Sequence, residues 1–342
     1  MSLSFLVNDP RESRPSTGSK QAYGFAVVSL ENIKNVLNGG KVRTVRHEPV
    51  MINEILEVLP LRPGATVVDG TLGLGGHSLR FLDRIRPGGS LVGFDWDEQM
   101  LAEAKRRIGT PEGAEVHLIH EDFRSIKDVM NRLGKTADGI LLDLGLNSAQ
   151  VDDPARGFSF QASGPLDMRM DRSKGEPAAA LLNRISIHQI GDILKDLGDE
   201  RWAVAIARKI IERRKESPLK TTQDLVDCVL GAIPPGARDK RIHPATRTFQ
   251  AIRIAVNQEL DGLEEALRDA ADVLSPDGVL AVLSYHSGED RIVKHTLRDL
   301  AEDGFEELTK KPRTASQEET VRNLRSRSAK LRALKRLKPL QT

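Results

Sequence analysis

Apolar residues recur along this chain at two spacings, one typical of helices and the other typical of buried strands. Residues 52–59 carry apolar side chains at helical spacing just after Pro49, which suits the first turn of a helix. Another helical pattern spans 97–108, where Asp97 is placed to cap the helix. Short apolar runs between such patterns predict strands at 65–69, 90–95, 116–119 and 138–143. Strands that alternate with helices predict a parallel sheet covered on both faces.

The alternation stops after the fourth predicted strand. Residues 146–180 are rich in Gly, Pro, Ser and Asp and are predicted to form loop, and residues 187–231 carry helical patterns. A long helical stretch then runs from 244 to 274, and residues 277–284 predict a fifth strand. The chain is therefore predicted to be an α/β protein whose Rossmann-like core is interrupted by an all-helical insertion. The predicted parts are an N-terminal extension at 1–40, a core at 41–149 and 246–335, and the insertion at 150–245.

The two ends of the chain carry patterns of their own. Residues 1–40 begin with a polar stretch that contains proline and is typical of disorder, and residues 25–37 fit a short helix. Residues 310–342 hold eleven Lys and Arg residues against Glu318 and Glu319. This excess of positive charge fits either a solvated tail or a segment that contacts phosphates, and the charge alone does not decide between them.

The composition is that of a soluble globular protein, with 39% hydrophobic and 29% charged residues. Cys228 is the only cysteine, so the chain has neither an internal disulfide nor a zinc site built from cysteines, and we expect no metal site. This cysteine usage suits a reducing cytoplasm. No apolar run resembles a signal peptide or reaches the roughly 18 residues of a membrane span, so we expect a cytoplasmic protein.

A glycine-rich turn follows the first predicted strand and opens a helix. It runs from Asp69 to His77, and Asp95 ends the next strand, where a carboxylate accepts hydrogen bonds from the hydroxyls of a ribose. The nicotinamide-dinucleotide fingerprint fails because Ser78 stands at its last small position, and no Lys-Ser/Thr pair follows as in a P-loop. Together with Asp143 at the end of the fourth strand, the loop and Asp95 fit the S-adenosylmethionine site of a Rossmann-like methyltransferase.

The residues also bear on which atom accepts a methyl group. Methylation at carbon 5 of a pyrimidine requires a cysteine nucleophile, and Cys228 lies in a probable helix where a role in the apolar core is the better interpretation. Methylation of an exocyclic amine needs no covalent intermediate, only an aligned amine and a hydrogen-bond acceptor. Residues 143–148 follow the fourth strand, where such groups would lie. They lack the Pro-Pro-aromatic sequence of DNA amino methylases, which disfavours DNA as the substrate.

Several long motifs resemble those of one known family and occur in the same order along the chain. They are His47-Glu-Pro-Val50 and the segments at 69–78, 138–145, 152–160, 164–171, 243–250, 284–291 and 325–332. By these segments the chain resembles the bacterial ribosomal RNA small-subunit methyltransferase H family. That family methylates the N4 amine of a cytosine near the decoding centre of 16S ribosomal RNA.

The resemblance implies a methyltransferase core with an inserted helical domain and S-adenosylmethionine as cofactor. The cofactor contacts that it implies are Gly75, Gly76, His77, Asp95, Phe123, Asp143 and Gln150. From the residues alone, Phe123 fits stacking on adenine and packing in the core equally well. The sequence departs from the family at Asn147 and Ala149, where Ser and Pro are common, and at Tyr285 and Gly288, where Phe and Leu are frequent. These departures leave the cofactor site intact and bear on how the acceptor is positioned.

A methylated base in structured RNA must be unpaired or extruded, and we expect it to enter between the glycine loop and the insertion. The candidate RNA contacts are Asn147, Ser148, Arg156, Arg169, Arg247, Arg253, His286 and Arg291. Internal ion pairs of Asp167 with Arg169 and of Glu289 with Arg291 are the alternative for two of them.

Other functions remain open at this point. One is an amino methyltransferase acting on DNA or on another RNA, and another is a ribosome assembly factor with little catalysis. The favoured interpretation is an enzyme whose partner is 16S ribosomal RNA within the small ribosomal subunit. The sequence names no catalytic base and does not indicate the oligomeric state.

Overall fold

The computed structural model describes residues 48–239 and 242–338. The strands are β1 (Thr66–Asp69), β2 (Gly89–Phe94), β3 (Ala114–Ile119), β4 (Ala137–Asp143), β5 (Leu274–Ser284), β6 (Phe305–Glu307), β7 (Arg313–Thr314) and β8 (Lys330–Arg336). The helices flanking the sheet are α2 (Ile52–Val58), α3 (Gly76–Ile85), α4 (Glu98–Ile108), α5 (Ile126–Leu133), α12 (Leu263–Asp272), α13 (Ser287–Ala301) and α14 (Gln317–Arg322). Between β4 and β5 lie α6 (Ser148–Asp152), α7 (Ala178–Arg184), α8 (Ile187–Asp192), α9 (Ala203–Glu216), α10 (Thr222–Ala232) and α11 (Thr246–Asn257).

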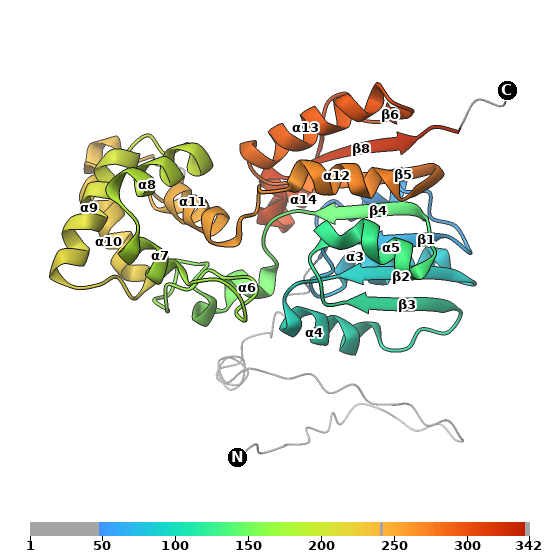
Figure 1. The fold of residues 1–342 in the computed structure, drawn as a ribbon, viewed down its shortest axis with the longest axis horizontal. Coiled ribbons are helices and arrows are strands. Elements are labelled where there is room, and N and C mark those ends of the chain that lie inside the picture. The colour runs from blue at the N-terminus through green and yellow to red at the C-terminus, as the bar shows by residue number, and fades with distance from the viewer. Residues whose placement is uncertain (1–47, 240–241, 339–342) are drawn as a thin grey trace, which may run out of the picture. The chain divides into compact units, whose positions relative to one another are not determined.

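The strands of the described residues form one sheet in the order β3-β2-β1-β4-β5-β8-β6, with β7 paired to β8 (Figure 1). Strands β1 to β5 are mutually parallel, whereas β8 runs antiparallel to β5, β6 and β7. The five predicted strands are all present, and the α/β Rossmann-like fold class is confirmed. Because β1 to β5 are parallel, their carboxyl ends share one edge, and the strand order reverses direction between β1 and β4. In such sheets a ligand binds at that edge.

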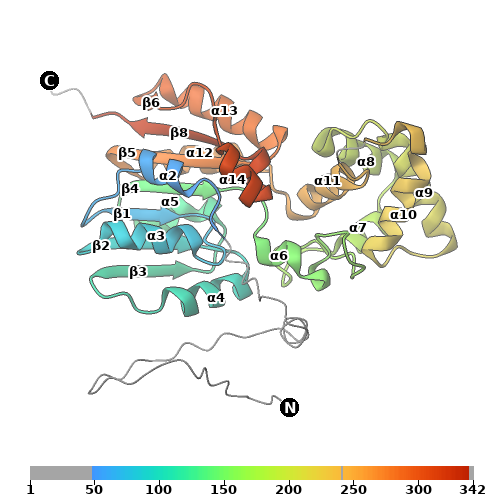
Figure 2. The ribbon, with the colours of Figure 1, turned by 180° about the vertical axis from the view of Figure 1, so that it is seen from behind.

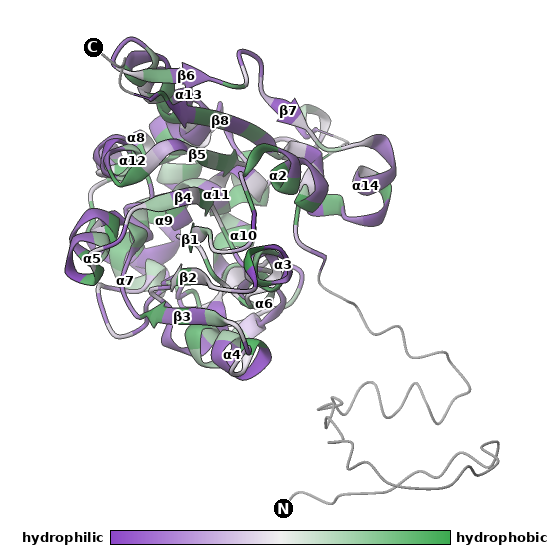
Figure 3. Ribbon diagram, turned by 90° about the vertical axis from the view of Figure 1, so that its right-hand side faces the viewer, coloured by the Kyte–Doolittle hydropathy of each residue, from purple (hydrophilic) through white to green (hydrophobic). Residues whose placement is uncertain are grey.

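Helices cover both faces of this sheet, as its apolar strands require. Every residue of β2 is buried, and in β4 Ile140, Leu141 and Leu142 are buried completely. Helices α5, α12 and α13 pack on one face, and α2, α3 and α4 pack on the other (Figures 1 and 2). Figure 3 shows hydrophobic colour along the central strands and hydrophilic colour on outer helix surfaces. The predicted cap of α4 is confirmed, since the Asp97 side chain accepts from two backbone N–H groups.

Part of the basic C-terminal segment belongs to the sheet as β7 and β8, which neither sequence interpretation anticipated. Leu331, Ala333 and Leu334 of β8 are fully buried. Between them, Arg332 donates to Asp290 across 2.7 Å, and the same carboxyl lies 2.9 Å from the Lys330 ammonium. Leu331 and Ala333 therefore pack on one face of the sheet and Leu334 on the other, and part of the strand's charge is neutralised within the protein.

The helices between β4 and β5 build an apolar core of their own. Phe249 and Ile252 of α11 pack in this core together with residues of α7 to α10. The predicted boundary at 245/246 is therefore wrong, because α11 belongs with the insertion, which extends through Asn257. The predicted helix at 244–274 is also interrupted, since Gln258 adopts a left-handed φ of 51° that ends α11.

Two sequence predictions concern residues outside the described part of the chain. The N-terminal extension at 1–40 and the helix predicted at 25–37 lie outside them. Where the chain is described, none of its helices has the length and apolar character needed to cross a membrane.

Candidate functional site

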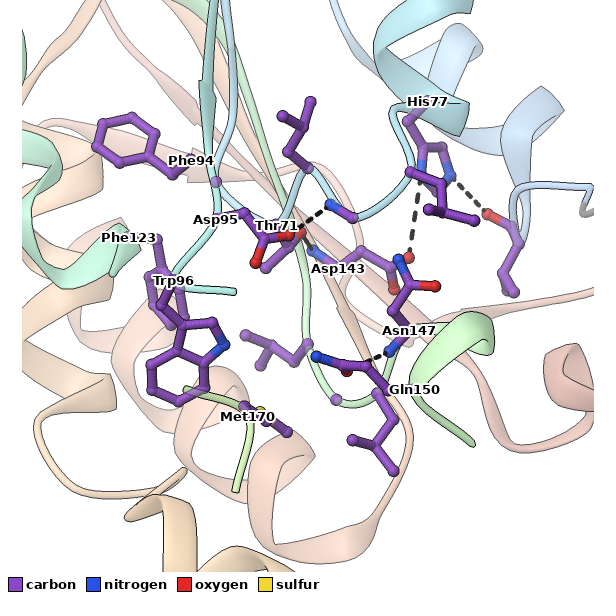
Figure 4. A pocket seen from close by; sticks show the side chains of 18 of the residues that line it. Thr71, His77, Phe94, Asp95, Trp96, Phe123, Asp143, Asn147, Gln150 and Met170 are labelled. Atoms are coloured by element: carbon purple, nitrogen blue, oxygen red, sulfur yellow. Dashed lines mark hydrogen bonds and ion pairs between the residues drawn. The ribbon is translucent and has the colours of Figure 1, made fainter. Parts of the chain in front are cut away.

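A cavity of about 450 Å³ opens at the carboxyl edge of the parallel strands. The loops after β1, β2, β3 and β4 line it, as do α6 and residues of the insertion such as Met170 and Arg253 (Figure 4). Its volume is within the range of small-molecule sites in proteins. On the insertion's side, Trp96 and Leu146 from the core's own loops pack against the insertion's apolar cluster. The cavity is thus formed jointly by the sheet and the helical insertion.

The loop after β1 brings bare backbone to the cavity wall. Gly73 has a φ of 51°, and a Cβ atom there would lie 2.1 Å from the Asn147 amide nitrogen. Gly75 has a φ of 73° and is the N-cap of α3 without a side-chain cap. Gly76 and His77 line the cavity, whereas Gly75 does not contribute to its surface. Glycine at these positions lets a ligand approach the peptide backbone closely.

Asp95 follows β2 and enters the cavity as a fixed carboxyl. One oxygen accepts the backbone N–H of Gly73 and the other accepts that of Asp97, each across 2.8 Å. Burial raises the pKa of Asp95 to about 7, although both backbone donors favour the ionised form. The carboxyl therefore bridges the glycine loop and the start of α4 and titrates near neutral pH.

Aromatic rings gather on the Asp95 side of the cavity. Phe94, Trp96 and Phe123 lie together there in Figure 4. The Arg124 guanidinium lies 5.9 Å from the Trp96 ring centroid and 5.5 Å from that of Phe123. Phe123 is half-buried, packs against the core and also lines the cavity. Its two sequence interpretations are therefore compatible with each other.

Asp143 ends β4 on the opposite side of the cavity from these rings. The Tyr285 hydroxyl donates to its Oδ1 across 2.6 Å, and His77 Nδ1 lies 3.9 Å from its Oδ2. His77 Nε2 lies 3.0 Å from the Val50 carbonyl, which only accepts, so we assign a proton to Nε2. Burial raises the pKa of Asp143 to about 6. The site thus holds a second carboxyl that titrates close to neutral pH.

A buried polar junction links the core to the insertion behind this cavity. Asp97 Oδ2 accepts from Gln150 Nε2 across 2.9 Å and from Arg156 Nη1 across 2.8 Å. The other terminal nitrogen of Arg156 donates to the carbonyl oxygens of Arg169 and Met170. Arg156 is only 3% exposed, so the expectation that it contacts RNA is wrong for this arrangement. Its guanidinium instead ties the loop after β2 to the insertion.

The segment after β4 is ordered by its own cap. The Asn147 side chain accepts from the Ala149 N–H at the start of α6, and Gln150 completes a capping box with the Asn147 backbone. Both side chains also line the cavity. Ser148 is the first residue of α6. The predicted acceptor segment therefore adjoins the glycine loop.

Two more candidate arginines form ion pairs inside the protein. Arg169 donates to Asp167 across 2.7 Å, which confirms the alternative of internal pairing for this residue. Arg253 donates both Nε and Nη2 to Glu259, each across 2.8 Å, and both residues line the cavity. A guanidinium held in this way presents its remaining edge at a fixed place.

The other three candidates lie at the edges of elements. His286 caps α13, and its Nε2 lies 3.1 Å from Glu289, so that the expected pair of Glu289 with Arg291 is replaced by this one. Arg247 donates to the backbone of Asp199. Arg291 is exposed on α13. Of these, Arg291 is exposed, whereas Arg247 and His286 are half-buried.

Sequence reasoning missed several residues that shape the cavity. Tyr285, Trp96, Thr71 and Met170 line it, and only Tyr285 stood out in the sequence, as a departure from a family pattern. A signal was available for two of them, because Tyr285 directly follows the carboxyl end of β5 and Trp96 lies two residues after that of β2. Met170 comes from the insertion, whose docking no local pattern encodes.

Cys228 has the structural role expected of it. It is buried in the insertion's core, and burial raises its pKa to about 11, which keeps the thiol protonated at neutral pH. It is not among the residues that line the cavity. In the described part of the chain, no group of three or more His, Cys, Asp or Glu side chains is arranged to hold a metal ion.

The parallel strand order, the glycine loop after β1 and the carboxyls at the ends of β2 and β4 define a Rossmann-like fold of the class I methyltransferase type. The sequence model of the MraW methylase family matches residues 44–337. The chain therefore belongs to the MraW methylase family.

Curated relatives agree with this assignment. A protein of Pelobacter propionicus named ribosomal RNA small subunit methyltransferase H is 46% identical over 310 residues, covering 85% of this chain and 99% of the relative. A protein of the same name from Trichlorobacter lovleyi is 46% identical over 308 residues, covering 85% and 98%. Among solved structures, an rRNA methylase from Streptococcus thermophilus aligns with 84% of this chain and 94% of its own, at 12% identity and a TM-score of 0.37.

Proposed function

We propose that this protein transfers a methyl group from S-adenosylmethionine to the N4 amine of a cytosine in 16S ribosomal RNA, near the decoding centre of the small subunit. Family membership and the relatives' names support ribosomal RNA as the substrate. The observation that carries the proposal is the placement of Asp95 and Asp143 on two sides of a glycine-walled cavity. We propose that the enzyme acts in the cytoplasm, where ribosomal subunits are assembled.

The residues of the cavity fit the proposed cofactor. A Cβ at Gly70 would lie 2.4 Å from the buried Leu142 side chain, so the loop can pass this close to β4 only because it carries no side chain there. Asp95 would accept hydrogen bonds from the ribose hydroxyls, and Phe123 would lie beside the adenine. Gly76 and His77 would hold the amino-acid end, with Gln150 supporting Asp97 behind the ribose. When bound, S-adenosylmethionine supplies an electrophilic methyl group on a sulfonium.

We propose that Asp143 serves the accepting amine. Its Oδ1 is occupied by Tyr285, whereas its Oδ2 has no hydrogen bond within the described residues and lies 3.9 Å from His77. An amine that donates one N–H to Oδ2 is turned so that its lone pair points along the cavity. The proton that the nitrogen sheds on methylation is then shared with a carboxyl whose pKa is about 6.

The same site argues against a covalent mechanism at a ring carbon. Such a mechanism needs a thiolate beside the base, and the buried Cys228 thiol has a pKa of about 11. Direct transfer to an exocyclic amine needs only alignment and a hydrogen-bond acceptor. The accepting base would enter beside residues 144–147, with Met170 and the Arg253–Glu259 pair on the far wall.

Substrate identity can be tested by methyl transfer from labelled S-adenosylmethionine. Small ribosomal subunits, naked 16S RNA and duplex DNA are the three acceptors, and mass spectrometry identifies the nucleoside that is formed. We expect N4-methylated cytidine from small subunits, and none from an Asp143→Ala variant. Label in DNA or in another nucleoside would show that the proposed substrate is wrong. Cofactor binding without methyl transfer would favour an assembly factor.

A further inference from the structure

Tyr285 reaches the reacting edge from a strand that neighbours β4. It directly follows β5, which pairs with β4 in parallel so that Leu283 lies opposite Asp143. Its hydroxyl donates to Asp143 Oδ1 across 2.6 Å. Its ring lies beside Gly145, where a Cβ would be 3.5 Å from ring carbon Cδ2. One side chain therefore contacts both the carboxyl and the loop that follows it.

The backbone of Tyr285 is itself anchored. Its N–H donates to Glu289 Oε2 across 2.8 Å, and Glu289 forms a capping box with His286 at the start of α13. Glu289 is 2% exposed, so this anchor is shielded from water. The position of the phenol is thus set by a buried helix start rather than by a mobile loop.

The hydroxyl also decides which carboxyl oxygen remains available. Oδ1 is taken by Tyr285, and Oδ2 faces His77 Nδ1 at 3.9 Å. At 3.9 Å, His77 Nδ1 lies beyond hydrogen-bond distance of Oδ2. The Tyr285 hydroxyl is therefore the side-chain donor that fixes the rotation of this carboxyl.

We propose that Tyr285 is a positioning residue for methyl transfer, whose hydroxyl orients the Asp143 carboxyl so that Oδ2 is presented to the accepting amine. This inference rests on the proposed function, in which Asp143 receives the amine. A phenylalanine would fill the same space beside Gly145 without orienting Asp143. Removal of the hydroxyl alone therefore distinguishes a positioning role of Tyr285 from a packing role.

Four titratable groups face Asp143 from the elements packed around it: Asp69 from β1, His77 from α3, Tyr285 after β5 and Glu289 from α13. Burial raises the Asp143 pKa, and the Tyr285 hydrogen bond opposes this by favouring the carboxylate. Removal of the hydroxyl should therefore raise the pKa further. The carboxylate would then be lost at a higher pH than in the unmodified protein.

The first test is the pH dependence of kcat/KM for Tyr285→Phe on small ribosomal subunits. We expect the acid limb to move to higher pH by up to about one unit, which lowers activity near pH 6 by up to roughly fivefold and leaves pH 8 nearly unchanged. A uniform loss at all pH values, or no change, would overturn the proposal. Tyr23→Phe, which removes the hydroxyl of the only other tyrosine, is the matched control and should keep the original profile.

The second test needs no substrate. In protein labelled with ¹³C at aspartate carboxyls, the Asp143 resonance is identified by its absence from Asp143→Asn. Its titration midpoint should rise in Tyr285→Phe, and an unchanged midpoint would refute the link between the two residues. Tyr285→Phe added to Asp143→Asn should have no further effect on the rate, since coupled residues are not additive. Because the titration is independent of the acceptor, it distinguishes failure of this inference from failure of the proposed substrate.

Discussion

At the scale of single residues, Asp95 shows how burial and hydrogen bonding oppose each other on one carboxyl. Its two backbone donors, Gly73 and Asp97, hold it in place. Burial nevertheless raises its pKa to about 7, so the free protein keeps part of this group protonated at neutral pH. The carboxyl is rigid before binding, and its charge state is what a ligand changes.

Asp95→Ala should weaken S-adenosylmethionine binding by roughly 100-fold, since two charge-assisted hydrogen bonds to the ribose are lost. The melting temperature should change little, because the variant also relieves the burial of a carboxylate. Calorimetric titration measures the affinity, and Asp83→Ala, at an exposed position on α3, is the control. An unchanged affinity would remove Asp95 from the cofactor site.

Cofactor binding should release protons between about pH 6 and 7. Burial raises the pKa values of Asp95 and Asp143 to about 7 and about 6, and hydrogen-bond donors or cationic groups in the ligand favour the ionised forms. Because the two pKa values are raised in the free protein, the carboxyls are partly protonated before the cofactor binds and lose these protons when it binds. The affinity for the cofactor should therefore fall as the pH drops through this range. Titration in buffers of different ionisation enthalpy counts the protons. A binding heat that is the same in every buffer would contradict the prediction.

At the scale of elements, the Asp97–Arg156 pair joins the loop after β2 to the insertion. Both side chains are almost fully buried, at 4% and 3% exposure, and Arg156 adds hydrogen bonds to the backbone of residues 169–170. A buried pair of this kind fixes the register of two elements more than it adds stability. The cofactor-side loop and the cavity wall at Met170 are therefore positioned by one guanidinium.

Arg156→Met should lower the free energy of unfolding by about 3–5 kcal/mol, because it leaves the Asp97 carboxylate buried without its cation. Denaturant unfolding measures this loss. Arg291→Ala, at an exposed position on α13, should leave stability unchanged while weakening RNA binding. If Arg156→Met kept its full stability and lost only RNA affinity, Arg156 would be an RNA contact after all.

The sequence predicts elements well where one pattern governs them, and poorly where partners are distant. Strands β1, β2, β4 and β5 were evident because each contains a short continuous apolar run, and β3 because it alternates with helical patterns. Strand β8 was missed because its buried Leu331 and Leu334 alternate with basic residues, which drew attention to charge. The boundary near 245 failed because α11 packs on helices that precede it in the chain.

The site residues were likewise predictable where a local pattern placed them and not where they depend on distant partners. Gly76, His77, Asp95 and Asp143 come together because all follow parallel strands, whose ends share one edge. The buried partners of Arg156 and Arg253 depend on how the insertion docks, which no local pattern contains.

At the scale of the whole molecule, the protein's positive charge is more balanced than the sequence suggests. Arg322 pairs with Glu48, and Lys335 and Lys338 pair with Asp277. Seven of the eleven basic residues in the C-terminal segment have an acidic neighbour among the described residues, namely Arg313, Arg322, Arg325, Lys330, Arg332, Lys335 and Lys338. Binding to RNA should rest on a small number of phosphate contacts.

RNA affinity should accordingly fall by about 10- to 100-fold between 50 and 200 mM salt, the drop expected for a few phosphate contacts. Affinity for S-adenosylmethionine should stay nearly constant over the same range. Filter binding at several salt concentrations gives the slope, and Arg291→Ala should reduce it by about one. A slope near zero would mean that recognition does not depend on phosphates.

The insertion between β4 and β5 also delays the pairing of these two strands during synthesis of the chain. Residues 144–273 must be translated before β5 can pair with β4, which takes about ten seconds at the usual rate of elongation. Until then β4 is an open edge with unpaired backbone groups, the kind of surface that recruits other unfolded chains. The nascent protein thus carries β4 as an unpaired strand edge until residues 274–284 have emerged.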